Sequence, residues 1–213
     1  MTGIGVARAE NLVEATQNTD VFVEVSGILK ACASSLLKIC SDLRLMSSGP
    51  EAGLGELRLP PRQAGSSIMP GKVNPVIPEA VSQTALLVMG YDAVIAIACA
   101  SGSLELNPFL PLVALCLLES IQLLASAADV LRTRCIDGLE ADEERCRRHV
   151  ESSTAVATAL VPVVGYSEAS AVAIEARRTG TTIRQVVVDR GLMAAPQFDS
   201  LITPEAVCRL GGS

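Results

Sequence analysis

Aromatic residues and histidine are scarce in this chain of 213 residues. It contains no Trp, two Tyr and three Phe, so aliphatic side chains have to build its core. Its single histidine, His149, excludes any site within this chain that needs several imidazoles. Charged residues make up 19% of the chain and hydrophobic residues 49%. Chains of this composition have enough apolar surface to fold, so intrinsic disorder is excluded.

Basic residues are also fewer than acidic residues. The chain has 17 Lys and Arg against 23 Asp and Glu, which gives a net charge of −6. Nucleic acids and anionic lipid surfaces attract proteins through an excess of positive charge. We therefore expect no nucleic-acid partner and no membrane partner.

The chain lacks paired-cysteine motifs and a signal peptide. Its seven cysteines are an odd number, none forms a CxxC pair, and most lie inside apolar helical patterns. This usage is typical of a reduced interior rather than of a disulfide framework or a zinc site. Residues 1–6 lack the apolar run of a signal peptide. The sequence therefore predicts a cytoplasmic protein with no metal and no cofactor.

Two apolar stretches, residues 85–100 and 109–130, have the length of membrane spans. Asp92 interrupts the first, and Glu119 and Asp129 interrupt the second. Charged groups at that depth are expensive in lipid, so we expect buried helices of a soluble bundle. The second stretch is apolar nearly all round, and such a helix has to be surrounded by others. One chain with three long helices cannot surround it, which predicts an obligate oligomer.

Hydrophobic spacing predicts a first domain, residues 1–138, built on long helices. Asn74-Pro75 and Asn107-Pro108 have the pattern of helix starts, with Asn as N-cap and Pro in the first helical position. Their helices are expected to reach about residues 100 and 134. Another helix is expected from residue 20 to 46, where apolar residues recur at steps of three or four: Val21, Val25, Ile28, Cys32, Leu36, Ile39 and Leu43.

A long loop and a second domain complete the expected organisation. Residues 47–71 show no sustained period, and structureless loops of about 25 residues are uncommon unless they have a function. Beyond Gly138, residues 139–213 are expected to form a small domain with short helices near 142–159, 167–178 and 182–190. The valines at 186–188 would also suit a strand, but a capping-box pattern at Thr182 and Gln185 favours a helix. The predicted fold class is all-α.

The segment at residues 65–75, GSSIMPGKVNP, carries the chemistry. It is not a phosphate loop, because five residues separate its glycines and Val73 follows Lys72. Glycines at both ends let the backbone bend over a ligand. Lys72 and the start of the following helix both favour an anion such as a carboxylate. The residues alone leave open a surface loop with an ordinary helix cap.

This segment resembles the signature loop of the aspartase/fumarase superfamily. The resemblance extends in order over essentially the whole chain, and residues 11–17 and 74–79 look more like the aspartate ammonia-lyase branch than the fumarate hydratase branch. Further segments similar to the family are residues 41–44, 48–50, 53–56, 104–107, 135–138, 159–160 and 165–166.

The resemblance implies a long-helix bundle of the aspartase/fumarase type that assembles as a homotetramer with sites shared between subunits. It implies a small dicarboxylate substrate, with ammonia eliminated from L-aspartate to give fumarate through an aci-carboxylate intermediate. By match to the motif, Ser66 would be the general base. Ser67, Lys72 and Asn74 would bind substrate carboxylates, and Glu79 would orient an active-site histidine from another segment.

Family members are considerably longer before the region that Met1 matches. The chain therefore looks truncated and is expected to be inactive alone, with a separate chain as one possible source of the missing N-terminal half. Two alternatives stay open at this stage. One is fumarate hydratase or another lyase that releases fumarate, and the other is a non-catalytic remnant that only oligomerises.

Overall fold

A computed structural model describes residues 3–49, 52–63, 73–153 and 156–203 of the chain. Backbone contacts divide the chain into two compact units, residues 1–140 and 141–213. Each unit is described by itself below.

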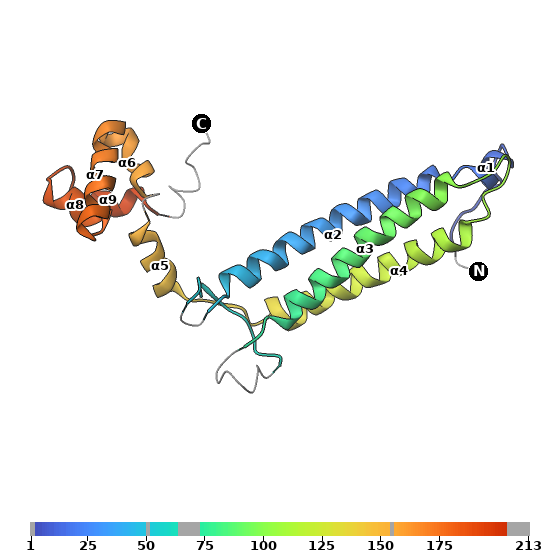
Figure 1. Cartoon of the computed structure of the whole chain (residues 1–213), viewed down its shortest axis with the longest axis horizontal. Helices are drawn as coiled ribbons and strands as arrows, with labels where there is room; N and C mark the ends of the chain where they lie inside the picture. The colour runs from blue at the N-terminus through green and yellow to red at the C-terminus, as the bar shows by residue number, and fades with distance from the viewer. Residues whose placement is uncertain (1–2, 50–51, 64–72, 154–155, 204–213) are drawn as a thin grey trace. The chain divides into compact units, whose positions relative to one another are not determined.

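Three long helices lie side by side in the first unit (Figure 1): α2 (Asp20–Met46), α3 (Val76–Ala100) and α4 (Leu110–Leu131). A short helix, α1 (Glu14–Gln17), precedes them, and α4 continues into a π-helical turn, η1 (Arg132–Ile136). The helices alternate in direction, so the end of α2, the start of α3 and η1 lie at one end of the bundle. The predicted all-α bundle is confirmed.

The start of α3 differs from the prediction. Asn74 was expected to cap the helix, but α3 begins at Val76, Pro75 occupies the N-cap position, and no side chain caps the helix. The backbone of Pro75 (φ −78°, ψ 57°) lies outside the helical region, so Pro75 cannot be the first helical residue. The carbonyl of Asn74 instead accepts a hydrogen bond from the amide of Val76 at 2.8 Å.

The same dipeptide behaves differently at Asn107-Pro108. Helix α4 begins later than predicted, at Leu110, with Phe109 in the N-cap position. The buried Asn107 side chain accepts from the Phe109 amide at 2.9 Å. Its Nδ2 donates to the carbonyls of Ala98 at 3.2 Å and Cys99 at 3.0 Å. Asn107 therefore fastens the end of α3 to the start of α4.

Helix α2 has the predicted bounds, but most residues of its apolar stripe are exposed. The residues that it buries within the chain are mostly small: Ser26, Ala33, Cys40 and Leu43. Small side chains let α2 approach α3 closely. Leu43 is the one stripe residue in that buried set, and Leu36 is partly buried, whereas the others are exposed: Val21, Val25, Ile28, Cys32 and Ile39.

Large apolar residues are exposed on α3 and α4 as well. Both α3 and residues 110–136 are long and apolar enough to cross a membrane by length and composition, and only 22% and 28% of their most apolar windows are buried. Core helices of soluble bundles pass the same test. The exposed residues are Leu86, Leu87, Val94 and Ile97 on α3, and Leu112, Leu115, Leu118, Ile121 and Val130 on α4.

The described part of the predicted loop contains ordered structure. Its strand β1 (Leu57–Arg58) pairs with β2 (Glu140–Ala141) in a two-stranded sheet. Before β1 the Leu54 amide donates to Ser48 Oγ at 3.1 Å. A Cβ atom on Gly53 would lie 2.3 Å from the Ser48 carbonyl oxygen, so this position requires glycine.

The second unit is a group of short helices: α5 (Glu143–Ser152), α6 (Ala157–Val164), α7 (Tyr166–Thr179), α8 (Ile183–Asp189) and α9 (Ala195–Leu201). The single helix expected over residues 142–159 was wrong. The chain leaves α5 at Ser153, whose backbone is extended (φ −81°, ψ 131°). The Val186–Val188 run is helical, and Thr182 accepts from the Gln185 amide at 3.2 Å as its cap.

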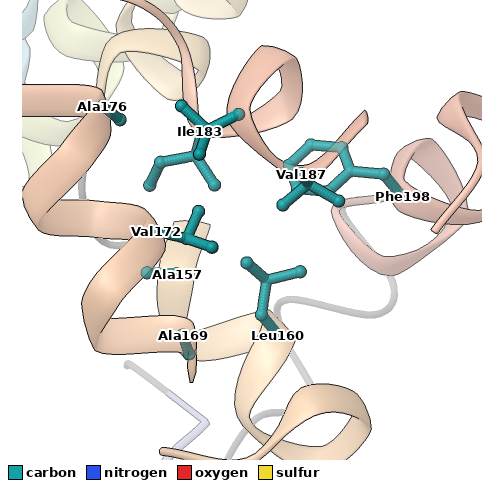
Figure 2. Close-up of a cluster of buried hydrophobic side chains, with 9 residues drawn as sticks. Ala157, Leu160, Ala169, Val172, Ala176, Ile183, Val187 and Phe198 are labelled. Carbon is teal, nitrogen blue, oxygen red and sulfur yellow. The ribbon is translucent and has the colours of Figure 1, made fainter. Parts of the chain in front are cut away.

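Aliphatic side chains from α6, α7 and α8 meet around one aromatic ring from α9 (Figure 2). Leu160, Val172 and Val187 are fully buried, and Phe198 is 2% exposed. The remaining members of this core are Ala157, Ala169, Ala176, Ile183 and Val186.

Candidate functional site

The predicted site residues fall into two groups. Ser66, Ser67 and Lys72 lie outside the residues that the structure describes. Asn74 and Glu79 are described, and both lie at the N-terminal end of α3. The segment that holds the first group therefore leads directly into this end of the bundle.

Asn74 lies partly buried at a small pocket between the start of α3 and the end of α4. Residues from both sides of the 64–72 segment and from η1 line this pocket. Its lining residues are Leu59, Pro60, Arg62, Asn74, Pro75, Val76, Ile77, Pro78, Arg134 and Cys135.

Glu79 occupies the first turn of α3, where the helix dipole favours a negative charge. Its Oε1 lies 4.0 Å from Nη2 of Arg44, which comes from the last turn of α2. Both side chains are partly exposed, so this ion pair contributes little to stability. It nevertheless holds a carboxylate and a guanidinium together at the end of the bundle.

Arg62 contacts η1 at this end of the bundle. Its Nε donates a hydrogen bond to the backbone carbonyl of Arg134 in η1 at 2.8 Å. Sequence reasoning singled out neither Arg44 nor Arg62 as a site residue. Arg44 lies within residues 41–44, a segment similar to the family, and a basic residue in the last turn of a helix is a recognisable signal. Arg62 lies in a stretch without hydrophobic periodicity, so nothing in the sequence pointed to it as a site residue.

Two buried thiols belong to the hydrophobic core at this end of the bundle. Cys40 and Cys135 belong to one core cluster. Burial raises the pKa of both thiols, and for Cys40 the neighbouring Cys135 raises it further. Cysteine acts as a nucleophile through its thiolate. Cys40 and Cys135 are therefore packing residues rather than candidates for covalent chemistry.

A second polar cluster lies within the bundle. The nearly buried Asp92 of α3 accepts from Ser26 Oγ at 2.8 Å and from Lys30 Nζ at 2.6 Å. Burial opposes ionisation of Asp92, but these hydrogen bonds and the charge of Lys30 outweigh it, so the pKa of Asp92 is lowered. In the sequence, Asp92 was noted only as an interruption of an apolar run. Its partners lie on α2 and tie the two helices together.

The chemistry available at the loop end of the bundle suits an anionic ligand. Arg44 pairs with Glu79, and Arg62, Arg134 and Asn74 are among the residues that line the pocket. Among the residues that the structure describes, no group of three or more His, Cys, Asp or Glu is placed to hold a metal ion. The described groups are of the kind that bind a carboxylate by charge and hydrogen bonding.

Comparison with protein families gives two matches. Residues 1–90 match the family described as "Lyase", and residues 156–209 match "Fumarase C C-terminus". The aspartate ammonia-lyase of Helicobacter pylori is 44% identical over 205 residues, which cover 96% of this chain and 44% of the relative. The chain thus spans less than half the length of this curated relative.

Solved structures agree with these matches. A fumarate lyase:delta crystallin from Brucella melitensis has a TM-score of 0.88 and 50% identity, with 95% of this chain and 45% of that chain covered. A class II fumarase from Schistosoma mansoni has a TM-score of 0.83 and 33% identity, with 92% and 41% covered. Together with the helical bundle and the motifs along it, these matches show that the chain belongs to the aspartase/fumarase superfamily.

Proposed function

We propose that this chain carries the signature loop and part of the helix bundle of an aspartate ammonia-lyase, which eliminates ammonia from L-aspartate to give fumarate. The observation that carries the proposal is the 44% identity to the Helicobacter pylori aspartate ammonia-lyase over 96% of the chain. The proposed dicarboxylate substrate, L-aspartate, rests on the same match.

In this mechanism Ser66 removes a proton from the carbon beside a substrate carboxylate. The charge passes into that carboxylate as an aci-carboxylate, and the amine then leaves. Ser67, Lys72 and Asn74 hold the carboxylates, and Glu79 orients a histidine from another segment. A serine alcohol is barely ionised near neutrality, so it needs nearby positive charge to act as a base. Lys72 and the N-terminus of α3 are the groups that would supply it.

The proposed assembly is a cytoplasmic homotetramer with shared sites. The exposed apolar faces of α2, α3 and α4 support it, because neighbouring subunits would cover them. The aspartase-like segment at residues 11–17 lies at the end of the bundle opposite Asn74, near the start of α4, where the Asn107 amide donates to the Thr16 carbonyl at 3.4 Å. Helix α3, about 37 Å long at 1.5 Å per residue, separates these two family-like segments within one chain.

Fumarate hydratase is the second candidate. It is favoured by the match of residues 156–209 to "Fumarase C C-terminus" and by the 33% identical class II fumarase. A non-catalytic remnant that only oligomerises is the third candidate. The substrate test below separates all three.

The test fuses the upstream part of the Helicobacter pylori relative, which this chain does not match, to this chain. We expect the fusion to form fumarate from L-aspartate, which can be measured by the ultraviolet absorbance of fumarate. We expect the 213-residue chain alone to show no turnover. Fumarate from L-malate but not from aspartate would favour the hydratase. A folded fusion without either activity would favour the remnant.

Ser66→Ala in the active fusion tests the proposed base. We expect kcat to fall by about 10²–10⁴, the usual contribution of a general base, while the carboxylate-binding groups remain. Lys72→Ala should instead raise KM as well as lower kcat, because it removes charge that binds substrate. If Ser66→Ala keeps a near-normal kcat and melting midpoint, Ser66 is not the base and Ser67 becomes the candidate.

A further inference from the structure

The two sides of the proposed catalytic loop converge on η1. Leu59, Pro60 and Arg62 precede the 64–72 segment, and residues 74–78 follow it. Both groups line the same small pocket, together with Arg134 and Cys135 of η1. Because both flanks of the 64–72 segment contact η1, η1 fixes the positions of these two described flanks.

Arg62 makes the side-chain hydrogen bond that joins the first of these sides to η1. Its Nε donates to the Arg134 carbonyl at 2.8 Å, across 72 residues of sequence. The last carbonyls of a helix lack intrahelical partners and attract positive charge. A charged guanidinium therefore makes a stronger bond here than a neutral donor would.

The electrostatics of Cys135 give a second indication that Arg62 lies against η1. Burial raises the pKa of the Cys135 thiol, and the positive charge of Arg62 partly offsets that rise. The guanidinium is thus close both to the Arg134 carbonyl and to the next side chain of the same π-helical turn.

Exposed ion pairs flank η1, and a buried core lies beneath it. Arg132 pairs with Asp129 at 3.1 Å and with Asp137 at 3.3 Å, on either side of the turn. The Asp137 amide donates to the Arg132 carbonyl at 2.8 Å. Leu131 and Cys135 are buried in the core beneath it. π-Helical turns within α-helices are frequently retained at functional sites.

We propose that Arg62 is a positioning residue for the Asn74 side of the proposed site: it fastens residues 59–62 to η1, so that the part of the pocket that faces Asn74 is held in place. The proposal rests on the proposed function for the catalytic part, but the fastening itself is independent of the substrate. Because the acceptor is a backbone carbonyl, the Arg134 side chain is not needed for it. Arg134→Ala is therefore a matched control that removes a neighbouring guanidinium and leaves the bond intact.

The first measurement is amide hydrogen exchange in the 213-residue chain, which needs no activity. We expect Arg62→Ala to speed exchange several-fold in residues 57–63 and 132–139, and Arg134→Ala to leave both segments as in the wild type. Arg62→Lys retains a charged donor, so its exchange should lie between the two. Equal exchange in Arg62→Ala and Arg134→Ala would overturn the proposal.

The second measurement is steady-state kinetics in the fusion with the upstream part of the relative. Arg62→Ala should lower kcat about tenfold, equivalent to about 1.4 kcal/mol, with a smaller change in KM and partial recovery in Arg62→Lys. Faster exchange with an unchanged kcat would mean that Arg62 is structural only. If the wild-type fusion is inactive, the proposed function fails, whereas the exchange measurement still decides whether Arg62 fastens residues 59–62 to η1.

Discussion

At the scale of single residues, Asp92 shows how a charged group can be kept inside an apolar bundle. A buried carboxylate without partners would be costly, but Ser26 and Lys30 both donate to it from the neighbouring helix. Lys30 is about half exposed, so part of its charge stays in water. This arrangement fixes one alignment of α2 against α3, because a shift of one turn would leave Asp92 without its donors.

We expect Asp92→Asn to lower the free energy of unfolding by about 1–2 kcal/mol near neutral pH, because two donors lose a charged acceptor. The pKa of Asp92 is lowered in the folded chain. Its contribution is therefore fully present above the unfolded value of about 3.9 and is lost as pH falls through the folded value. Urea denaturation of wild type and variant should show a difference that shrinks in acid.

The control for this comparison is Asp42→Asn. Asp42 pairs with Lys38 one turn away on the surface of α2, where such pairs contribute less than about 0.5 kcal/mol. An equal loss in both variants would mean that the buried cluster is no more important than a surface ion pair.

At the scale of elements, the same residue type has opposite roles at two glycines. Gly53 precedes β1 and lies where a side chain would collide with the Ser48 backbone. Gly90 lies inside α3, and a Cβ added there would meet nothing within 4 Å in this chain. The first glycine is required by close approach of the backbone, and the second only weakens its helix.

Gly53→Ala should destabilise the chain by about 1–3 kcal/mol, because backbone atoms have to move to admit the methyl group. Gly90→Ala should leave stability unchanged or raise it by up to about 1 kcal/mol through better helix propensity. Melting midpoints of the two variants provide the measurement. A Gly53→Ala variant as stable as wild type would show that the chain before β1 adapts easily.

At the scale of the whole molecule, the main feature is apolar surface that the chain does not cover itself. Ile28 of α2 is 66% exposed, and so is Leu118 of α4. Single exposed apolar residues are ordinary, but here they recur along all three long helices. The apolar character of α4 on every side led to the expectation of an oligomer, and the exposure of α2 and α3 extends that argument.

Sedimentation at micromolar concentration should therefore show dimers, tetramers or larger species rather than monomers. Ile28→Glu and Leu118→Glu should each shift the distribution towards smaller species, because burying an unpaired carboxylate in a subunit interface is costly. A wild-type chain that sediments as a single monomeric species would contradict the inference that other subunits cover the apolar faces of α2, α3 and α4. It would also contradict the proposed assembly with shared sites.

The sequence by itself determined the features that depend on near neighbours along the chain. The bounds of α2 followed from the spacing of its apolar residues, and the cap of α8 followed from Thr182, because helix formation and capping involve groups within one turn. The all-α fold and the superfamily likewise followed from motifs that are read locally.

Only the tertiary structure decided which of those features face one another. Asn74 and Asn107 precede proline in the same way, yet only Asn107 is buried and bonded between two helices. The face that α2 buries carries mostly small residues rather than its apolar stripe. The Arg62 contact joins residues 72 positions apart. Such contacts depend on the shapes of distant surfaces, whereas periodicity reports only which residues share a face of one helix.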